Sequence, residues 1–226
     1  MSISAVDWKE AASFLGGLGA RAEVIERLEF QEQALEFLVL LLQKNEMVNL
    51  TGARDLETAF WKHLVDSLTL WSVPDLGSVV DWGSGGGFPA IPLALARKHS
   101  GEEFPVHFLD SVGKKVRAVE EFCQALNLPN AHGHIGRGEE LLKSRSLGHV
   151  DSVVMRAVAP AERAVAWVKP IAKQWILLLG PSQVDDWRAQ ERELSRSGMK
   201  ILDDKKFLLP RGLGERSLLR ISKSST

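Results

Sequence analysis

Residues 79–92 read VVDWGSGGGFPAIP, and this stretch decides the fold. Apolar strand-forming residues come first, glycines stand at 83, 85 and 87, and an apolar segment follows. Glycine lets the backbone turn at positive φ and leaves no Cβ between chain and ligand, while the N-terminus of a following helix supplies unpaired amides. The pattern therefore predicts a buried strand, a glycine turn and a helix that together hold a nucleotide-like cofactor.

The spacing of the glycines narrows the choice of cofactor. The motif is G-x-G-x-G, and Phe88 stands where a dinucleotide fingerprint wants a small residue. No Gly-Lys-Ser/Thr follows, which excludes a Walker A loop. Asp81 at the end of the strand favours S-adenosylmethionine (SAM). On this stretch alone, NAD(P) and a glycine turn without a ligand stay open as alternatives.

Length and composition indicate a globular protein. The 226 residues suit one α/β domain with an accessory segment, and 45% hydrophobic residues are enough for a core. No apolar run approaches a membrane span, and the first residues lack the basic and apolar segments of an export signal. One cysteine, Cys123, cannot form an intramolecular disulfide. We therefore expect a cytoplasmic protein without a membrane segment.

The charge distribution is uneven although the net charge is only −1. Residues 1–60 hold ten acidic and five basic residues, whereas residues 205–226 hold six basic residues and one acidic residue. The net charge argues against coating nucleic acid by bulk charge. A basic end could still orient a phosphate backbone, and simple solvation of these side chains is the equally weighted alternative.

The pattern of apolar residues divides the chain into two parts. Helical periodicity over 21–43 and 55–70 predicts an N-terminal helical segment, residues 1–76, that packs on the core. Residues 77–226 alternate strands with helices, which predicts a doubly wound, mostly parallel Rossmann-like sheet. The expected strands are the one before the glycine turn and 104–110, 130–135, 150–155 and 174–179. The expected helices are 90–98, 114–127, 160–173 and 184–197, and segments 200–209 and 216–221 are expected to form an antiparallel edge hairpin.

Two charged features follow the second strand. Asp110 lies 23 residues beyond Gly87, about where a nucleotide-binding α/β fold presents a carboxylate to ribose hydroxyls. Lys114, Lys115 and Arg117 then crowd the start of a helix, where the dipole prefers acids. An unfavourable local arrangement of this kind indicates an external anion, either an RNA phosphate or a cofactor carboxylate, with plain solvation as the alternative.

Seven short motifs occur in one order between residues 49 and 216. They are Asn49-Leu50-Thr51, Lys62-His63-Leu64-Val65-Asp66-Ser67-Leu68, residues 81–89, Leu109-Asp110-Ser111 with Gly113-Lys114-Lys115, Arg137-Gly138-Glu139-Glu140, Arg156-Ala157-Val158-Ala159 and Gly214-Glu215-Arg216. In this order they resemble the RsmG family, formerly GidB, bacterial methyltransferases that modify guanine N7 in 16S ribosomal RNA. The resemblance implies the class I SAM-dependent methyltransferase fold, SAM as cofactor, and 16S RNA or the small ribosomal subunit as partner. No cluster of cysteine and histidine indicates a structural metal, and we expect a monomer.

The resemblance also implies site residues. Asp110 would bind the ribose, Gly138 and Glu139 would border the adenine, and Arg156 would face the reaction centre as the candidate catalytic residue. The cofactor-binding set is Asp81, Gly83, Ser84, Gly85, Phe88, Asp110, Ser111, Gly138, Glu139 and Arg156. The RNA-binding set is Lys114, Lys115, Arg117 and Arg216.

The chain departs from the family pattern at one position where a charged side chain could contact the substrate. Such families usually carry a lysine before the glycine that closes the fifth strand, and this chain has Leu179 before Gly180. Lys173 is near in sequence but out of register. A fixed cation at that position could hold a phosphate or the target base.

The residues themselves favour methylation of a nitrogen with a lone pair. Guanine N7 has no proton to lose, so no strong general base is needed, and Cys123 is predicted to be a core residue rather than a nucleophile. Arg156 can donate to guanine O6 or pair with a phosphate. His63 beside Asp66 is interpreted as structural. A SAM-dependent enzyme for another RNA or a small molecule, an NAD(P)-dependent oxidoreductase and a non-catalytic SAM-binding protein are the alternatives.

Overall fold

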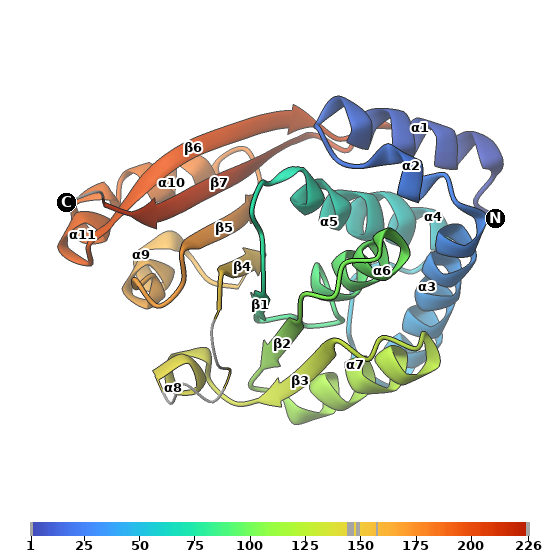
Figure 1. Cartoon of the computed structure of the whole chain (residues 1–226), viewed down its shortest axis with the longest axis horizontal. Helices are drawn as coiled ribbons and strands as arrows, with labels where there is room; N and C mark the ends of the chain where they lie inside the picture. The colour runs from blue at the N-terminus through green and yellow to red at the C-terminus, as the bar shows by residue number, and fades with distance from the viewer. Residues whose placement is uncertain (1, 144–146, 148–149, 157, 225–226) are drawn as a thin grey trace.

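The computed structural model describes residues 2–143, 147, 150–156 and 158–224. Within them a seven-stranded sheet runs in the order β3-β2-β1-β4-β5-β7-β6 (Figure 1). Its strands are β1 (Val79–Trp82), β2 (Val106–Asp110), β3 (Ala131–Ile135), β4 (Ser152–Arg156), β5 (Gln174–Leu179), β6 (Met199–Leu208) and β7 (Glu215–Lys223). Strands β1 to β5 are parallel, and β7 and β6 add to β5 antiparallel. The predicted doubly wound sheet with an antiparallel edge hairpin is confirmed.

The strand order creates a crevice in the middle of the sheet. From β1 the chain proceeds outward to β2 and β3, and it then returns to the other side of β1 with β4. Helices that follow β1 and β4 therefore leave toward opposite sides, and in such sheets ligands bind beyond the carboxyl ends of the strands at this switch point.

Helices cover both faces of the sheet (Figure 1). One face carries α6 (Ala90–Ser100), α7 (Gly113–Ala125) and the N-terminal helices, and the other carries α9 (Ala161–Ala164), η3 (Val165–Trp167), α10 (Gln183–Arg188) and α11 (Glu191–Arg196), with α8 (Gly138–Lys143) beside them. Because side chains alternate along a strand, Val79 belongs to the first core and Val80 and Trp82 to the second. Asp81 therefore points to the face of the N-terminal helices.

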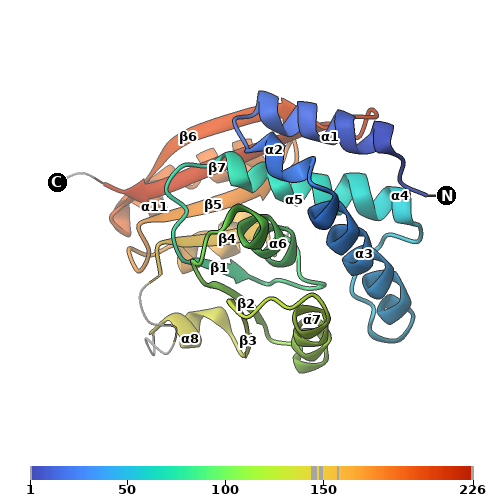
Figure 2. The same cartoon turned by 45° about the vertical axis from the view of Figure 1, so that its right-hand side comes forward.

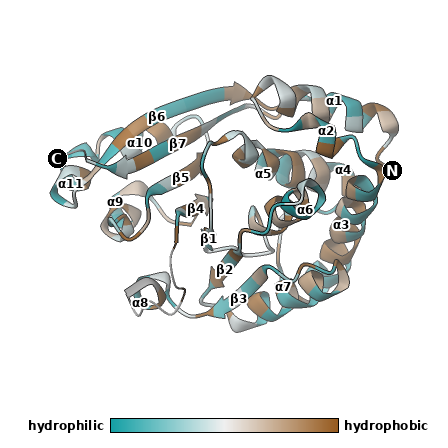
Figure 3. Cartoon of the chain, in the orientation of Figure 1, coloured by the Kyte–Doolittle hydropathy of each residue, from teal (hydrophilic) through white to brown (hydrophobic). Residues whose placement is uncertain are grey.

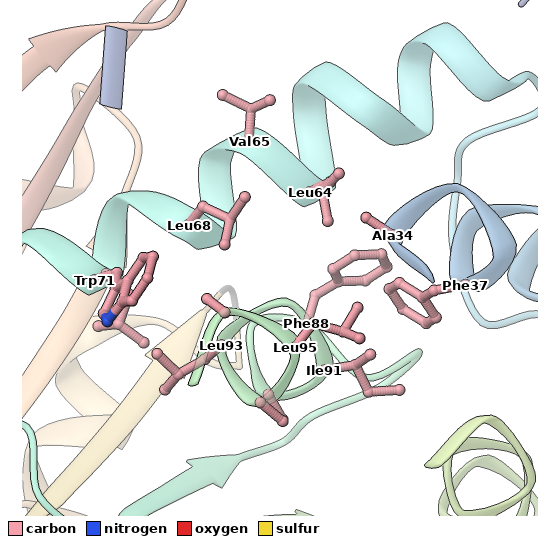
Figure 4. Close-up of a cluster of buried hydrophobic side chains, with 14 of the residues drawn as sticks. Ala34, Phe37, Leu64, Val65, Leu68, Trp71, Phe88, Ile91, Leu93 and Leu95 are labelled. Atoms are coloured by element: carbon pink, nitrogen blue, oxygen red, sulfur yellow. The ribbon is translucent and has the colours of Figure 1, made fainter. Parts of the chain in front are cut away.

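The N-terminal segment forms most of the layer on the first face. Its helices are α1 (Ala5–Gly17), α2 (Ala22–Ile25), α3 (Leu28–Val48), α4 (Leu56–Ala59), the π-helical η1 (Phe60–Val65), α5 (Asp66–Leu68) and the 3-10 helix η2 (Thr69–Ser72). Helices α3 and α7 alternate hydrophilic and hydrophobic segments along their length (Figure 3). Phe37 of α3 lies 5.2 Å, ring to ring, from Phe88, and Leu64 and Ile91 surround the same cluster (Figure 4). The segment thus shares a core with the sheet, and its division from the rest at residue 76 stays a prediction.

Helix α1 was not predicted from the periodicity. Ser4 and Asp7 form a capping box at its start, since the Ser4 N–H donates to Asp7 at 2.8 Å and Ser4 Oγ accepts from the Asp7 N–H. Arg211, in the loop between β6 and β7, pairs with Asp7 at 2.8 Å and Glu10 at 2.6 Å. The helix therefore lies beside the tip of the β6–β7 hairpin (Figure 2).

Several predicted helix boundaries are wrong, each for a physical reason. The helix predicted over 160–173 ends at Trp167, because Val168 is extended and Pro170 disfavours helix in the residue before it. The helix predicted over 184–197 is broken at Ala189 and Gln190 into α10 and α11. Helix α3 runs to Val48 rather than residue 43, with Asn49 in the left-handed region at φ 57°. Among the described residues no helix is long and apolar enough to span a bilayer.

Candidate functional site

The glycine turn between β1 and α6 is tied to the end of β2. The N–H groups of Gly83 and Ser84 donate to the Leu109 carbonyl at 2.8 and 2.9 Å. Gly83, Gly85 and Gly87 have φ values of 78°, 56° and 91°, which glycine adopts without strain. A Cβ on Gly83 would lie 2.9 Å from a Val158 methyl group, so the turn also needs glycine for close approach to the segment after β4.

A cavity of about 580 Å³ opens beyond this turn, at the carboxyl ends of β1 and β2. Six predicted cofactor residues line it, namely Gly83, Gly85, Asp110, Ser111, Gly138 and Glu139. Trp82, Leu109, Lys115, Gly136, Arg137, Val158, Arg163 and Trp167 complete the lining. Its volume lies in the range of small-molecule and cofactor sites. The structure thus brings together residues of the glycine turn, of the end of β2 and of the start of α8.

Asp110 ends β2 at the edge of this cavity. One carboxylate oxygen accepts from the Gly85 N–H at 3.1 Å, and the other accepts from the Val112 N–H at 2.8 Å. Each oxygen has a further lone pair, so the carboxylate can still accept from two vicinal hydroxyls. The arrangement suits the ribose contact predicted for Asp110.

An aromatic wall closes the opposite side. The Trp82 and Trp167 rings stack with centroids 5.4 Å apart, and a Cβ on Gly138 would lie 2.4 Å from the Trp82 ring. Glycine at 138 therefore lets α8 begin directly against the indole. Neither tryptophan is among the predicted site residues, and Trp82 also belongs to the buried core of the second face. The position of Trp82 inside the glycine motif could have identified it as a cavity residue, whereas no motif surrounds Trp167.

Asp81 and Ser84 lie behind the turn and do not line the cavity. Asp81 is fully buried, and its Oδ2 accepts from the Ala90 N–H at 3.0 Å. Among the described residues Asp81 Oδ1 and Ser84 Oγ are buried without a hydrogen-bond partner. Burial raises the pKa of Asp81 to about 7. Orphaned buried polar atoms are uncommon, and both of these lie behind the turn rather than in the cavity.

Phe88 also lies outside the cavity. It is 8% exposed, its ring packs on Phe37, and its centroid is 5.0 Å from that of His63. The alternation of the chain after the turn directs this side chain into the N-terminal helices. The structure therefore gives Phe88 a packing position rather than the predicted place in the lining.

Arg156 anchors a second group of polar side chains, on the face of the N-terminal helices. Its Nη2 donates to the Lys62 carbonyl at 2.6 Å and to His63 Nδ1 at 3.0 Å, and it lies 3.1 Å from Asp66 Oδ2. Arg216 Nε is 3.8 Å from the other oxygen of Asp66. We call Thr51, His63, Asp66, Arg156 and Arg216 the Arg156 cluster. Ala157, the next residue of that motif, lies outside the described residues.

Asp66 is the buried acid of this cluster. The side chain is 4% exposed, and burial raises its pKa while Arg156 and Arg216 oppose that effect. Two cations therefore surround one carboxylate, which leaves positive charge beside the carboxyl end of β4. Arg216, predicted to bind RNA, is in the structure a partner of Asp66.

Comparison with known sequences decides the family. Residues 30–212 match the family described as GidB: rRNA small subunit methyltransferase G. The chain belongs to the GidB family. Ribosomal RNA small subunit methyltransferase G of Microcystis aeruginosa is 36% identical over 199 residues, covering 81% of this chain and 86% of that protein. The protein of the same name from Deinococcus radiodurans is 34% identical over 201 residues, covering 85% of this chain and 78% of that protein.

Solved structures outside the GidB family share the fold. TrmK of M. capricolum, solved with S-adenosyl-homocysteine, superposes with a TM-score of 0.53 at 12% identity, over 68% of this chain and 65% of that chain. A putative tRNA (m1A22) methyltransferase of Streptococcus pneumoniae gives 0.52 at 15% identity, over 69% and 68%. At these identities the likeness concerns the fold alone.

The position where the GidB pattern was expected to carry lysine is apolar here. Leu179 is 6% exposed and belongs to the core of the second face. Lys173 cannot replace a lysine there, because it precedes β5 and pairs with Asp151 at 2.7 Å. Cations near the cavity come instead from Lys115, Arg137 and Arg163, which line it.

The remaining predicted cations surround the start of α7. Lys114 and Arg117 are exposed, and Lys115 is half-buried in the cavity lining. Cys123 is buried, and burial raises the pKa of its thiol to about 12, which suits the predicted core role. Among the described residues no group of three or more histidine, cysteine, aspartate or glutamate side chains is arranged to hold a metal.

Proposed function

We propose that this protein transfers the methyl group of SAM to N7 of a guanine in 16S ribosomal RNA. Membership of the GidB family supports the substrate class. The observation that carries the chemistry is the cavity at the glycine turn, edged by Asp110 on one side and walled by Trp82 and Gly138 on the other. Cytoplasmic location and a monomeric state follow as further parts of the proposal.

The cavity residues would hold the cofactor. Asp110 would accept from ribose hydroxyls, and Gly138 and Glu139 would border the adenine against the Trp82 ring. Bound SAM supplies an electrophilic methyl group on a sulfonium.

The chain's own contribution to the reaction is positioning and charge. A guanine N7 lone pair needs no deprotonation, and a guanidinium has donors and no acceptor, so Arg156 would act as a donor and not as a base. Donation to guanine O6 would orient the base without taking a proton from it. Lys114, Lys115 and Arg117 would meet RNA phosphates beside the cavity.

The test is a methyl-transfer assay with defined acceptors. The purified full chain is incubated with isotopically labelled SAM and with 16S RNA, small subunits, transfer RNA or a metabolite extract, the RNA coming from a strain that lacks this methylation. Digestion and mass spectrometry then map 7-methylguanosine. Label in 16S RNA at one guanine N7 supports the proposal. Label only in transfer RNA or in small molecules overturns it.

A further inference from the structure

The hydrogen bonds of His63 determine where its proton lies. His63 Nδ1 is 3.0 Å from Arg156 Nη2, and His63 Nε2 is 2.7 Å from Thr51 Oγ1. A guanidinium can only donate, so Nδ1 must accept. The single proton of the neutral ring is therefore on Nε2, and it is donated to the Thr51 hydroxyl. The same hydroxyl accepts from the Ala53 N–H at 3.1 Å.

The surroundings hold the ring neutral and in place. His63 lies in the π-helical η1, and its ring packs against Phe88 at 5.0 Å between centroids. Burial, and the adjacent Arg156 cation, lower the pKa of His63 to about 4. Near neutral pH the ring can therefore serve as an acceptor for Arg156.

Arg156 is held by one nitrogen only. The Lys62 carbonyl, His63 Nδ1 and Asp66 Oδ2 all meet Nη2, at 2.6, 3.0 and 3.1 Å. Among the described residues Nε and Nη1 of Arg156 form no hydrogen bond, although the side chain is only 18% exposed. The two acceptors, Lys62 and His63, and the ion-pair partner Asp66 all come from the N-terminal segment, some 90 residues before Arg156. That segment thus fixes the guanidinium and leaves two of its nitrogens for a ligand.

We infer that His63 is a positioning residue, which holds Arg156 through Nδ1 so that a free N–H of the guanidinium donates to O6 of the guanine that is methylated. This inference rests on the proposed function. A planar donor fixed at O6 places N7 of the same base at a defined distance and angle from the reacting methyl group, and orientation of this kind contributes to kcat rather than to cofactor affinity. His63 takes no proton in this role. Its contribution is to the orientation of Arg156.

The experiment compares substitutions that keep or remove the Nδ1 acceptor. The amide oxygen of asparagine stands as many bonds from Cβ as Nδ1 does, whereas the polar atoms of glutamine stand at the distance of Nε2. We expect His63→Asn to keep kcat within about threefold, and His63→Gln and His63→Leu to lower it about tenfold or more, the effect of one charge-assisted hydrogen bond. The Michaelis constant for SAM should change less than about twofold in all three.

His99→Asn is the matched control. His99 lies in α6, bonds to Gln33 at 2.9 Å, and is remote from the Arg156 cluster, so this variant should keep the wild-type kcat. Thermal melting of each variant identifies losses due to unfolding. Nitrogen-15 NMR of labelled histidine gives an independent measurement, and it should show Nε2 of His63 protonated and Nδ1 unprotonated at pH 7.

The outcomes separate this inference from the proposed function. Equal loss of kcat in His63→Asn and His63→Leu, with both folded, overturns the positioning role, as does a wild-type kcat in all three. A protonated Nδ1 overturns it as well. No methyl transfer to 16S RNA by the wild-type chain overturns the proposed function itself, and this inference with it.

Discussion

The two sides of the glycine turn are built differently. The cavity side consists of backbone turns and residues that lie within short motifs, since Gly83, Asp110 and Gly138 each stand at the end of a strand or the start of a helix. The Arg156 cluster draws its members from the N-terminal segment, β4 and β7, and its first and last members, Thr51 and Arg216, are 165 positions apart. On the proposed function, a cofactor that is the same in many enzymes would be met by local structure, whereas the proposed substrate side depends on tertiary packing.

Replacing Arg156 tests the substrate side and carries the largest expected effect. Arg156→Ala removes the charged donor and leaves Asp66 buried with a single cation at 3.8 Å. We expect kcat for 16S RNA to fall about 100-fold or more, as when a preorganised donor is lost, while the dissociation constant for SAM changes less than about threefold. Single-turnover kinetics and calorimetry measure the two quantities.

Arg196→Ala is the control for this change. Arg196 is exposed on α11 and pairs only at the surface with Glu193, so kcat and SAM binding should both stay at the wild-type value. A tenfold loss of SAM affinity in Arg156→Ala would contradict the separation of the two sides.

Alanine substitutions at two glycines of the same turn should affect different properties, SAM affinity at Gly83 and thermal stability at Gly86. Gly83→Ala forces a methyl group to 2.9 Å from Val158 at φ 78°, so SAM affinity should fall about tenfold or more. Gly86→Ala meets the Leu50 carbonyl at 2.9 Å on the N-terminal side, so it should lower the melting temperature with a smaller effect on SAM affinity. Calorimetry and thermal melting measure both, with Gly17→Ala, which has open space around it, as the control. Equal losses of SAM affinity would contradict the comparison.

The sequence predicts the cavity side better than the Arg156 cluster. The glycine spacing, Asp110 at the end of β2 and Gly138 at the start of α8 are local signals, and the structure places all three in one cavity. Phe88 and Asp81 have the same local signal, but strand alternation and the packing of Phe37 place them behind the turn. His63 looked structural because its partner Arg156 is 93 residues away, and no periodicity reports such a contact.

Asp81 lies between the two sides, and its pKa gives a test by pH. Burial raises that pKa to about 7 from an ordinary 3.8, so from pH 4 to 7 the folded state holds a proton that the unfolded state releases. This contribution to stability is therefore lost as pH rises, by about 1.4 kcal/mol per pH unit. Asp81→Asn lacks it, so its stability relative to wild type should increase between pH 4 and 7 and level off above pH 8.

Urea denaturation at several pH values measures that difference, and the lowered pKa values of the histidines cancel because both proteins share them. Ser182→Ala, at the exposed N-cap of α10, replaces a side chain that does not titrate in this range, so this control should give a difference independent of pH. A constant difference for Asp81→Asn as well would show that Asp81 stays charged behind the turn.

The smallest effects are expected at the rim of the cavity, where Lys114 and Arg117 are exposed at the start of α7. If each contacts a phosphate, the double variant Lys114→Ala with Arg117→Ala should reduce the slope of log affinity for RNA against log salt by about 0.7 per charge, with SAM affinity unchanged. Lys9→Ala with Arg196→Ala removes the same charge from α1 and α11 and should leave the slope as it is.

Arg216→Ala should behave differently from both double variants, because Arg216 lies beside Asp66 rather than at the rim. We expect this variant to lower kcat and to leave the salt slope nearly unchanged. A reduced salt slope with a wild-type kcat would show that Arg216 binds RNA phosphate instead of supporting the Arg156 cluster.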